Sequence, residues 1–212
     1  SKCSTSYPSL IKFLDPFLCP GKRGKYMKFF FPDSIDMIDP LYDFLNECHS
    51  PEHIRQRHDF YAHETLESCP YDGLLVSKAA VDGIGNKSGR YTLAQRNRLY
   101  REGVRQFFRL DENKVTARID TMGDCGAFAY VNEKIPPYSV SEVVDFYNDC
   151  GFDYGVSVDH VILGYNAKCD DPDLFDQGVS AEWRARRELT LSLAGEFLAR
   201  SKELASRFIP VG

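Results

Sequence analysis

The apolar positions of this chain follow strand and helix periods in turn from about residue 71 onward. Short apolar runs between turn residues predict buried strands, and apolar residues spaced three and four apart predict amphipathic helices. The predicted elements are strands at Gly73–Ser77, Val104–Leu110, Thr116–Thr121, Tyr154–Ile162 and Phe208–Val211, and helices at Thr92–Glu102, Ser139–Gly151 and Ala181–Ser206. Strands that alternate with helices predict parallel βαβ units.

Two of these helices carry start and stop signals. Thr92 is a capping residue before the first, and Gly103 follows its last residue. Ser139 opens the second, with Glu142 three residues later as a capping box, and Gly151 ends it. A side-chain oxygen at the first position satisfies backbone N–H groups that the helix itself leaves unpaired, and glycine accepts the left-handed backbone that often ends a helix.

The first 70 residues are less regular. Residues 1–26 are marked by proline, glycine and lysine, and we expect them to form an N-terminal extension to a domain at 27–212. Lys28–Phe31 predicts a short aromatic strand, and the acidic segment Asp33–Glu47 predicts a loop. Glu52–His63 has the composition of a helix.

The composition is typical of soluble globular proteins: 212 residues, of which 43% are hydrophobic and 27% charged. No apolar run approaches the roughly 18 residues that span a membrane, and the N-terminus does not resemble a signal peptide. Seven cysteines are scattered without a CxxC pair, which argues against a disulfide framework and against a zinc ribbon. We therefore expect a cytoplasmic protein with no membrane partner.

The charge pattern argues against a wholly basic nucleic-acid-binding surface, because the net charge is −5. The basic residues are nevertheless clustered, at 22–28, 96–109 and 184–187. Solvated helix faces explain such clusters more often than phosphate contacts do, and the sequence leaves both readings open.

The most informative chemistry lies in the segment 121–128. Asp124 stands between Gly123 and Gly126, just after a predicted strand, and Phe128 follows four positions later. The glycines allow a sharp turn and a close approach of a flat ligand, a carboxylate accepts hydrogen bonds from ring N–H and amino groups, and an aromatic ring stacks. This pattern suits a purine-like base. The plainer alternative is a turn in which Asp124 bonds the backbone.

Three neighbouring residues carry weaker signals. Cys125 fits a small residue lining this loop better than a reactive thiol, because no histidine lies nearby in sequence to activate it. Asp159, in the predicted strand Tyr154–Ile162, is either a second base-reading carboxylate or a cap of the following loop. His160 beside it is most simply a structural hydrogen-bonding histidine. For Phe128, the alternative to stacking is a place in the core.

Four histidines, at positions 49, 53, 58 and 63, have near-helical spacings that invite a metal hypothesis. The segment around them is polar, and we expect it to face solvent. The sequence therefore predicts no metal ligand among these residues.

The fold class is decided by where the carboxylates stand. A doubly wound sheet usually carries a glycine-rich phosphate loop after its first strand, and the glycines at 83–89 have the wrong spacing. Carboxylates at successive strand ends favour an α/β fold of the (β/α)8 TIM-barrel type, whose active sites are assembled from those ends. Five or six strands are fewer than a closed barrel needs. We therefore expect an incomplete barrel in these residues, completed by a missing half or by a partner chain.

With both aspartates placed, the chain resembles the tRNA-guanine transglycosylase family, and within it more closely the bacterial DNA-guanine transglycosylases of the DpdA type. The segments that carry the resemblance are Met27–Ser34, Tyr71–Lys78, Gly123–Phe128, Pro136–Val140, Val156–His160 and Ile209–Gly212. The similarity covers 27–212, which corresponds to the N-terminal half of the family's catalytic barrel.

The resemblance implies a transferase that exchanges guanine in a polynucleotide for a 7-deazaguanine base (7-cyano-7-deazaguanine class) through a covalent sugar–enzyme intermediate. It gives Asp124 the catalytic proton-handling and base-binding role, Phe128 the stacking ring and Asp159 the second base-reading carboxylate. Cys125 stands where the family has serine, so it joins the base-binding set. His160 replaces an acidic residue, a departure that bears on substrate range.

The resemblance also implies parts that these residues do not contain. The nucleophilic aspartate and a Cys/His zinc site are expected beyond Gly212, so no cofactor is expected within 1–212. The expected partners are DNA and the free deazaguanine base. Two alternatives stay open: exchange on tRNA of the queuosine or archaeosine type, and a catalytically incomplete barrel subunit that binds a base or nucleic acid.

Overall fold

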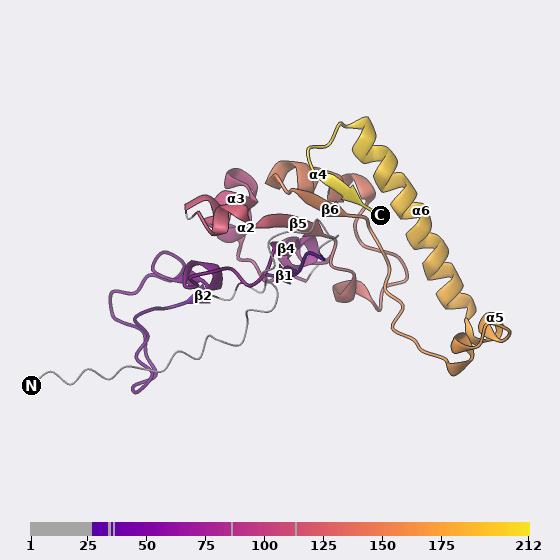
Figure 1. Cartoon of the computed structure of the whole chain (residues 1–212), viewed down its shortest axis with the longest axis horizontal. Helices are drawn as coiled ribbons and strands as arrows, with labels where there is room; N and C mark the ends of the chain where they lie inside the picture. Colours follow the sequence, from indigo (N-terminus) through magenta and orange to yellow (C-terminus); the bar gives the residue numbers. More distant parts are fainter. Residues whose placement is uncertain (1–26, 34, 36, 86, 113) are drawn as a thin grey trace, which may run out of the picture.

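The computed structural model describes residues 27–212 except 34, 36, 86 and 113, so the predicted extension at 1–26 lies outside the described residues (Figure 1). The strands are β1 (Phe30–Pro32), β2 (Met37–Ile38), β3 (Phe60–Tyr61), β4 (Gly73–Ser77), β5 (Asp120–Asp124), β6 (Tyr154–Val156) and β7 (Ile209–Val211). The α-helices are α1 (Lys78–Asp82), α2 (Leu93–Glu102), α3 (Val104–Phe107), α4 (Val140–Cys150), α5 (Phe175–Gly178) and α6 (Ala181–Glu203). Short 3-10 helices are η1 (Ala62–Glu64), η2 (Leu110–Glu112), η3 (Thr116–Arg118), η4 (Ala127–Tyr130) and η5 (Ala167–Asp170).

Five strands form one parallel sheet in the order β1-β4-β5-β6-β7, and β2 and β3 form a separate antiparallel pair. Each new strand of the large sheet is added at the same edge, without the reversal of order that defines a doubly wound sheet. The predicted α/β class with parallel strands is therefore confirmed. Closure into a (β/α)8 barrel stays a prediction.

One face of the sheet is covered by helices. Tyr147 of α4 lies directly over Gly123 of β5 and Gly155 of β6, where an added Cβ would come within 2.3 Å and 2.5 Å of its ring. Phe197 of α6 and Phe208 continue this aromatic layer, with ring centroids 6.1 Å and 5.4 Å from that of Tyr147. Gly123 thus serves close helix–sheet packing, and not the approach of a ligand that its sequence context suggested. In Figure 1, α4 and α6 lie beside β6 and β7.

The opposite face of the sheet is less covered. Leu75 and Met122 are paired neighbours in β4 and β5, and Met122 is in turn paired with Tyr154 of β6. All three side chains are only half-buried. Asp124 lies two residues after Met122, so it shares this face. This is the face that the strands of a closed barrel would enclose.

The predicted capping signals are confirmed. The hydroxyl of Thr92 accepts a hydrogen bond from the backbone N–H of Gln95, and the Gln95 side chain accepts one from the Thr92 N–H. Ser139 and Glu142 form the same reciprocal pair at the start of α4. Gly151 takes φ +70° at the end of that helix, as the sequence predicted.

The predicted strand at Val104–Leu110 is wrong, because Val104–Phe107 is helical and Leu110 begins η2. Val104, Phe107 and Phe108 are all buried. Their spacing of three and four places them on one helix face, a period that their β-branched and aromatic composition obscured. Similarly, residues 116–118 form η3, so strand β5 starts later than predicted and runs on to Asp124.

The predicted helix at Glu52–His63 is also wrong. Side chains within the segment take its backbone N–H groups: His58 Nδ1 accepts from Ile54 at 3.2 Å, and Asp59 accepts from Gln56 at 2.6 Å. Gln56 itself has φ +68°, which no α-helix contains. Local bonds of this kind compete with a helix and here replace it.

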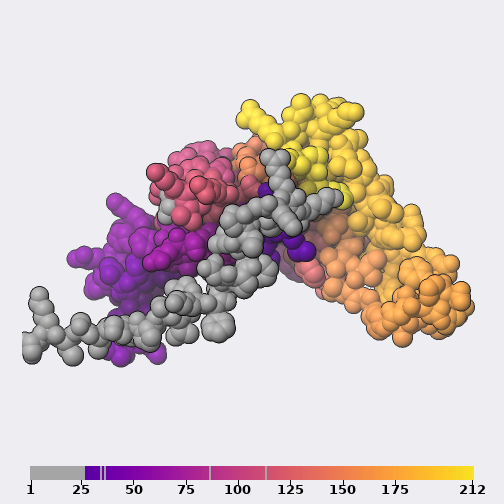
Figure 2. Space-filling model, viewed as in Figure 1, coloured from indigo at the N-terminus to yellow at the C-terminus, as the bar shows by residue number. Residues whose placement is uncertain are grey.

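The predicted strand at Tyr154–Ile162 is shorter than expected, since β6 ends at Val156. Within the described part of the chain, no helix is both long enough and apolar enough to cross a membrane. Figure 2 shows α5 and the adjoining end of α6 projecting from the body of the molecule, away from the segment around β2 and β3.

Candidate active site

A cavity of about 960 Å³ opens at the carboxyl ends of the parallel strands. Four polar residues at or just beyond four successive strand ends line it: Asp33 after β1, Ser77 of β4, Asp124 of β5 and Asp159 after β6. In parallel α/β sheets, ligands bind at this edge. The cavity therefore gathers the two sequence-predicted aspartates into one site.

The register of the paired strands brings these polar residues together. Asp124 is the last residue of β5 and is paired with Ser77 of β4, while Gly123 before it is paired with Gly155 of β6. Asp159 stands three residues beyond the end of β6. Because neighbouring parallel strands end at the same level, two carboxylates that are 35 positions apart in sequence meet at one rim.

Asp124 is held in a half-buried position. Its Oδ2 accepts a hydrogen bond of 2.9 Å from the backbone N–H of Gly126, which is the local turn that the plainer sequence reading expected. Burial and the nearby negative charge of Asp159 raise the pKa of the Asp124 carboxyl, against the lowering effect of backbone hydrogen bonds from Gly126 and Cys125. A carboxyl group with a raised pKa is suited to donate and recover a proton.

Cys125 lies beneath the cavity and is fully buried. Its thiol donates a hydrogen bond of 3.0 Å to Oδ1 of Asp159, and the hydroxyl of Tyr130 lies 3.0 Å from its sulfur. Burial, followed by the charges of Asp124 and Asp159, raises the pKa of the Cys125 thiol to about 12. Cys125 is thus a neutral donor that positions Asp159 from below, in a place where the sequence suggested a residue in contact with the base.

Phe128 stands at the cavity with 73% of its surface exposed, which excludes the alternative that it belongs to the core. It lies in η4, which starts after Gly126. Gly126 has φ +86°, and a Cβ there would come within 2.1 Å of Ser77 Oγ. Only glycine allows the chain to turn here between β5 and η4, and this turn brings the ring of Phe128 to the rim.

His160 is a structural residue, as the sequence suggested. Its Nε2–H donates to the carbonyl of Glu133 at 2.6 Å, and its backbone N–H donates to the hydroxyl of Thr190 in α6 at 3.0 Å. The guanidinium of Arg186 donates to the carbonyls of Val131 and Val161, both at 2.9 Å. These bonds hold the segment after Asp159 against α6.

The clustered arginines are mostly committed to structure. Arg105 bonds Asp111 and the carbonyls of Ala117 and Ile119, and Arg109 bonds Glu64. Arg184 pairs with Asp176 in the third cluster. The preference for structural and solvated roles over phosphate contacts is therefore supported for these groups.

Sequence reasoning missed two basic residues at the cavity, Lys87 and Arg90. Both are exposed, both line the cavity, and neither forms an ion pair with any residue that the structure describes. Lys87 lies in the loop after α1, within the 83–89 segment that we set aside because its glycine spacing fits no nucleotide fingerprint, and Arg90 directly follows that segment. Only their position beside Asp124 and Phe128 gives them a possible role in binding.

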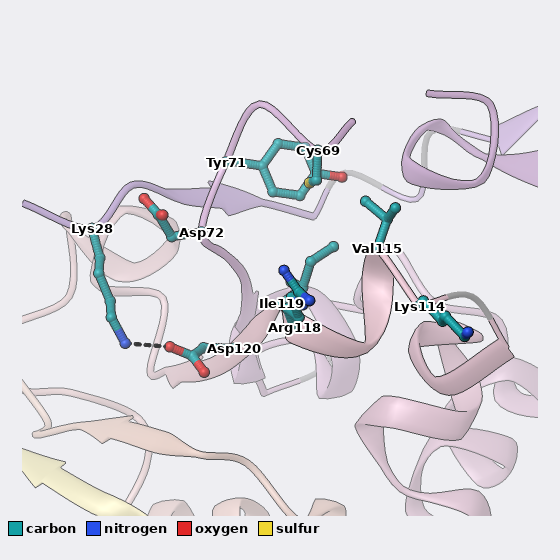
Figure 3. Close-up of a pocket in the computed structure, with 9 residues that line it drawn as sticks. All are labelled: Lys28, Cys69, Tyr71, Asp72, Lys114, Val115, Arg118, Ile119 and Asp120. Carbon is teal, nitrogen blue, oxygen red and sulfur yellow. Dashed lines mark hydrogen bonds and ion pairs between the residues drawn. The ribbon is translucent and has the colours of Figure 1, made fainter. Parts of the chain in front are cut away.

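A second cavity of about 540 Å³ lies at the opposite, amino-terminal ends of the strands (Figure 3). Lys28 and Asp120 form an ion pair of 2.5 Å there, and Asp72 and Arg118 also line it. Lys28 and Asp120 neutralise each other at the strand starts, whereas ligands of parallel α/β sheets bind at the carboxyl ends of the strands. We therefore assign the site to the larger cavity.

The parallel α/β sheet thus places two carboxylates and an exposed aromatic ring around one strand-end cavity, an arrangement suited to a flat, hydrogen-bonding ligand. No family model matches the chain. A DNA-guanine transglycosylase of Salmonella montevideo is 50% identical over 186 residues, which cover 88% of this chain. This similarity confirms the resemblance to DpdA-like guanine transglycosylases that the motifs indicated. The chain spans 42% of the length of that relative.

Proposed function

We propose that this chain forms the base-binding part of a transglycosylase that exchanges guanine in DNA for a 7-deazaguanine base of the 7-cyano-7-deazaguanine class. The observation that carries the proposal is the meeting of Asp124 and Asp159 at one cavity, with the exposed ring of Phe128 beside them. The similarity to a protein named DNA-guanine transglycosylase supports the same assignment.

The proposed exchange leaves the sugar–phosphate backbone intact. A carboxylate nucleophile attacks the anomeric carbon, the glycosidic bond breaks, and Asp124 gives its proton to the departing guanine. Asp124 then takes a proton from the incoming deazaguanine, whose ring nitrogen attacks the same carbon and releases the carboxylate. The raised pKa of Asp124 supports this role, because the carboxyl must be protonated in the first step. Asp159, held by Cys125, reads the amidine edge of the base.

The nucleophile is a third carboxylate. Asp124 and Asp159 both face the base in this proposal, so neither is free to lie beneath the sugar. The relative extends well beyond the aligned part, since this chain covers 42% of it. We propose that the nucleophile, and the strands that would close a barrel around the open face of the sheet, correspond to the part of the relative that lies outside the alignment.

A base in a DNA duplex must leave the stack to reach such a cavity, at a cost of about a few kcal/mol. Stacking on Phe128 offsets this cost by about 1–3 kcal/mol. Lys87 and Arg90 at the rim are placed to contact the phosphates on either side of the flipped nucleotide. These contacts supply a basic surface although the chain as a whole is acidic.

The test is incorporation of labelled 7-cyano-7-deazaguanine into guanine-containing DNA by the full-length protein. We expect label in DNA, and a loss of about 10²–10⁴-fold in rate for Asp124→Asn. Asp145→Asn on the exposed face of α4 is the matched control and is expected to leave the rate unchanged. No label in DNA with the folded parent protein would refute the proposal, and full activity of Asp124→Asn would remove Asp124 from the chemistry.

Two alternatives are separated by the same assay. When DNA and tRNA compete, label in tRNA alone would favour the tRNA-guanine transglycosylase reading, for which the same two aspartates would serve. Binding of the free base to the protein without label in either polynucleotide would favour a catalytically incomplete subunit.

A further inference from the structure

The segment between β2 and β3 contains a second cluster of possible ligand atoms, far in sequence from the site described above. Asp39 directly follows β2, Asp59 directly precedes β3, and His49 and His53 lie in the connection between them. Residues 40–58 contain no helix or strand of the sheets. A connection of this length without regular structure is uncommon in a compact domain unless something else orders it.

The polar side-chain atoms of this cluster lie close to one another. His49 Nδ1 lies 2.6 Å from Asp39 Oδ2, and His53 Nε2 lies 3.7 Å from the same oxygen. His53 Nε2 also lies 2.6 Å from Asp59 Oδ1. The ligand atoms of Asp39, His49 and His53 are all within 4.8 Å of one another.

Most of this cluster is buried, although the sequence led us to expect that the segment faces solvent. The side chains of Asp39, His53 and Asp59 are 4%, 8% and 7% exposed, and only His49 is open to solvent. Among the described residues, neither aspartate forms an ion pair with lysine or arginine; their charged partners are these two imidazoles. Two buried carboxylates whose partners are imidazoles, with no ion pair to lysine or arginine among the described residues, form an environment that favours a cation.

The apolar residues of the connection do not order it. Leu41, Phe44, Leu45 and Ile54 are 72%, 83%, 96% and 50% exposed. A segment that has no core of its own commonly depends on a disulfide or a metal ion. Cys48, the cysteine of this segment, is free. The buried polar cluster ties the ends of the connection to its middle, in addition to the hydrogen bond that Arg109 donates to the carbonyl of Gln56.

We propose that Asp39, His49 and His53 bind a structural Zn²⁺ ion that fixes this connection, with Asp59 or a water in the fourth position. Imidazole nitrogen and carboxylate oxygen are ordinary zinc ligands, and bonds of about 2.0–2.1 Å in a tetrahedron put ligand atoms about 3.3 Å apart. The separations of 2.6 and 3.7 Å bracket that value. On binding, the protons shared between His49 Nδ1 and Asp39, and between His53 Nε2 and Asp59, leave to solvent, and both ring nitrogens bond the metal. Asp59 Oδ1 is then left beside the ion.

This site is independent of the proposed base exchange, and it contains no cysteine ligand. The test uses Co²⁺ as a spectroscopic substitute for Zn²⁺, added to the metal-free chain. We expect one equivalent to bind with the intense visible absorption of a tetrahedral site and without the near-ultraviolet band of a sulfur–cobalt bond. Zn²⁺ should displace it and raise the melting temperature. A sulfur–cobalt band, or no binding of one equivalent, would overturn the proposal.

The ligands are tested by substitution. Asp39→Asn and His53→Ala are expected to weaken Co²⁺ binding by more than about tenfold. His58→Asn is the matched control: His58 is a histidine of the same connection whose Nδ1 is taken by the backbone N–H of Ile54, and asparagine retains an acceptor. Asp39→Asn keeps the size of the side chain, so a folded variant with unchanged affinity would refute the ligand assignment even if His53→Ala does not fold.

Discussion

The thiol of Cys125 donates a hydrogen bond to Oδ1 of Asp159 across 3.0 Å. This bond joins the loop after β5 to the segment after β6, directly beneath the proposed base pocket. The sulfur sits where the related family carries a serine hydroxyl, and both groups can donate to a carboxylate. A serine hydroxyl at this position would supply the same kind of donor to Asp159.

The effect of replacing Cys125 on binding of the base should depend on whether the new side chain can donate a hydrogen bond to Asp159. A net hydrogen bond contributes about 0.5–1.5 kcal/mol, so Cys125→Ala is expected to raise the KM for the deazaguanine about 2–10-fold. Cys125→Ser retains a donor and should stay close to the parent. The measurement is base-exchange kinetics of the full-length protein, with melting temperatures as the control for folding. Equal KM values for the alanine and serine variants would contradict the positioning role.

The same residue should resist thiol reagents. Cys125 is fully buried, and burial with two nearby carboxylates raises the pKa of its thiol to about 12, so little thiolate forms at neutral pH. Cys48 is exposed and free. Brief treatment of the native chain with iodoacetamide should label Cys48 and leave Cys125 unmodified, as read by mass spectrometry of peptides. Denatured chain, in which both are labelled, is the control. Rapid native labelling of Cys125 would instead indicate a reactive thiol.

Asp124→Asn should stabilise the fold at neutral pH. Burial and the charge of Asp159 raise the pKa of Asp124 above its ordinary value of 3.8, so the native state binds the proton more tightly than the unfolded state. Below pH 3.8 the Asp124 carboxyl is protonated in both the native and the unfolded state, so it costs the native state no stability. As the pH rises through the raised native pKa, ionisation of Asp124 increasingly destabilises the native state. Asparagine does not titrate and can still accept from Gly126.

The urea midpoint of Asp124→Asn should therefore exceed that of the parent increasingly from acidic to neutral pH. Asp145→Asn, at an exposed position of α4, should show no such trend. A variant that is less stable than the parent at neutral pH would show that the ionised carboxylate stabilises the fold.

Gly126→Ala tests the turn that presents Phe128. The position has φ +86°, and the new Cβ would lie 2.1 Å from Ser77 Oγ and 2.6 Å from Ala79 Cβ. Gly151→Ala is the matched control, because it has φ +70° but no atom within 4 Å of the added Cβ. The control should lose about 1–2 kcal/mol from backbone strain alone. Gly126→Ala should lose more than this in denaturant unfolding, and equal losses would mean that the clash is relieved without cost.

Lys87→Ala and Arg90→Ala test the proposed DNA contacts. Each phosphate contact removed should reduce the slope of log affinity against log salt by about 0.7–0.9. Lys114→Ala, an exposed lysine at the second cavity, is the control and should leave the slope unchanged. Fluorescence anisotropy with a guanine-containing duplex, measured over a range of salt concentrations, supplies the slopes. Equal slopes for all three variants would place the DNA elsewhere.

Features that depend on residues close together in the chain could be predicted from the sequence alone. The capping pairs Thr92–Gln95 and Ser139–Glu142 lie within one helical turn, so their donors and acceptors are readable from spacing. The apolar run Gly73–Ser77 and the positions of Asp124 and Asp159 near strand ends were readable in the same way. The parallel arrangement followed from the alternation of strands and helices.

Only the tertiary structure decided which distant residues meet. The thiol of Cys125 reaches Asp159 because strands β5 and β6 are paired in register, and Asp39 meets His53 because a long connection folds back between β2 and β3. Folding also made Val104–Phe107 a helix, since its buried face satisfies the core in that conformation. Periodicity indicates which face of a segment is apolar, whereas contacts between residues far apart in the sequence depend on the packing of the whole chain. The resemblance already paired Asp124 with Asp159, but the bond from Cys125 to Asp159 and the contact between Asp39 and His53 became visible only after folding.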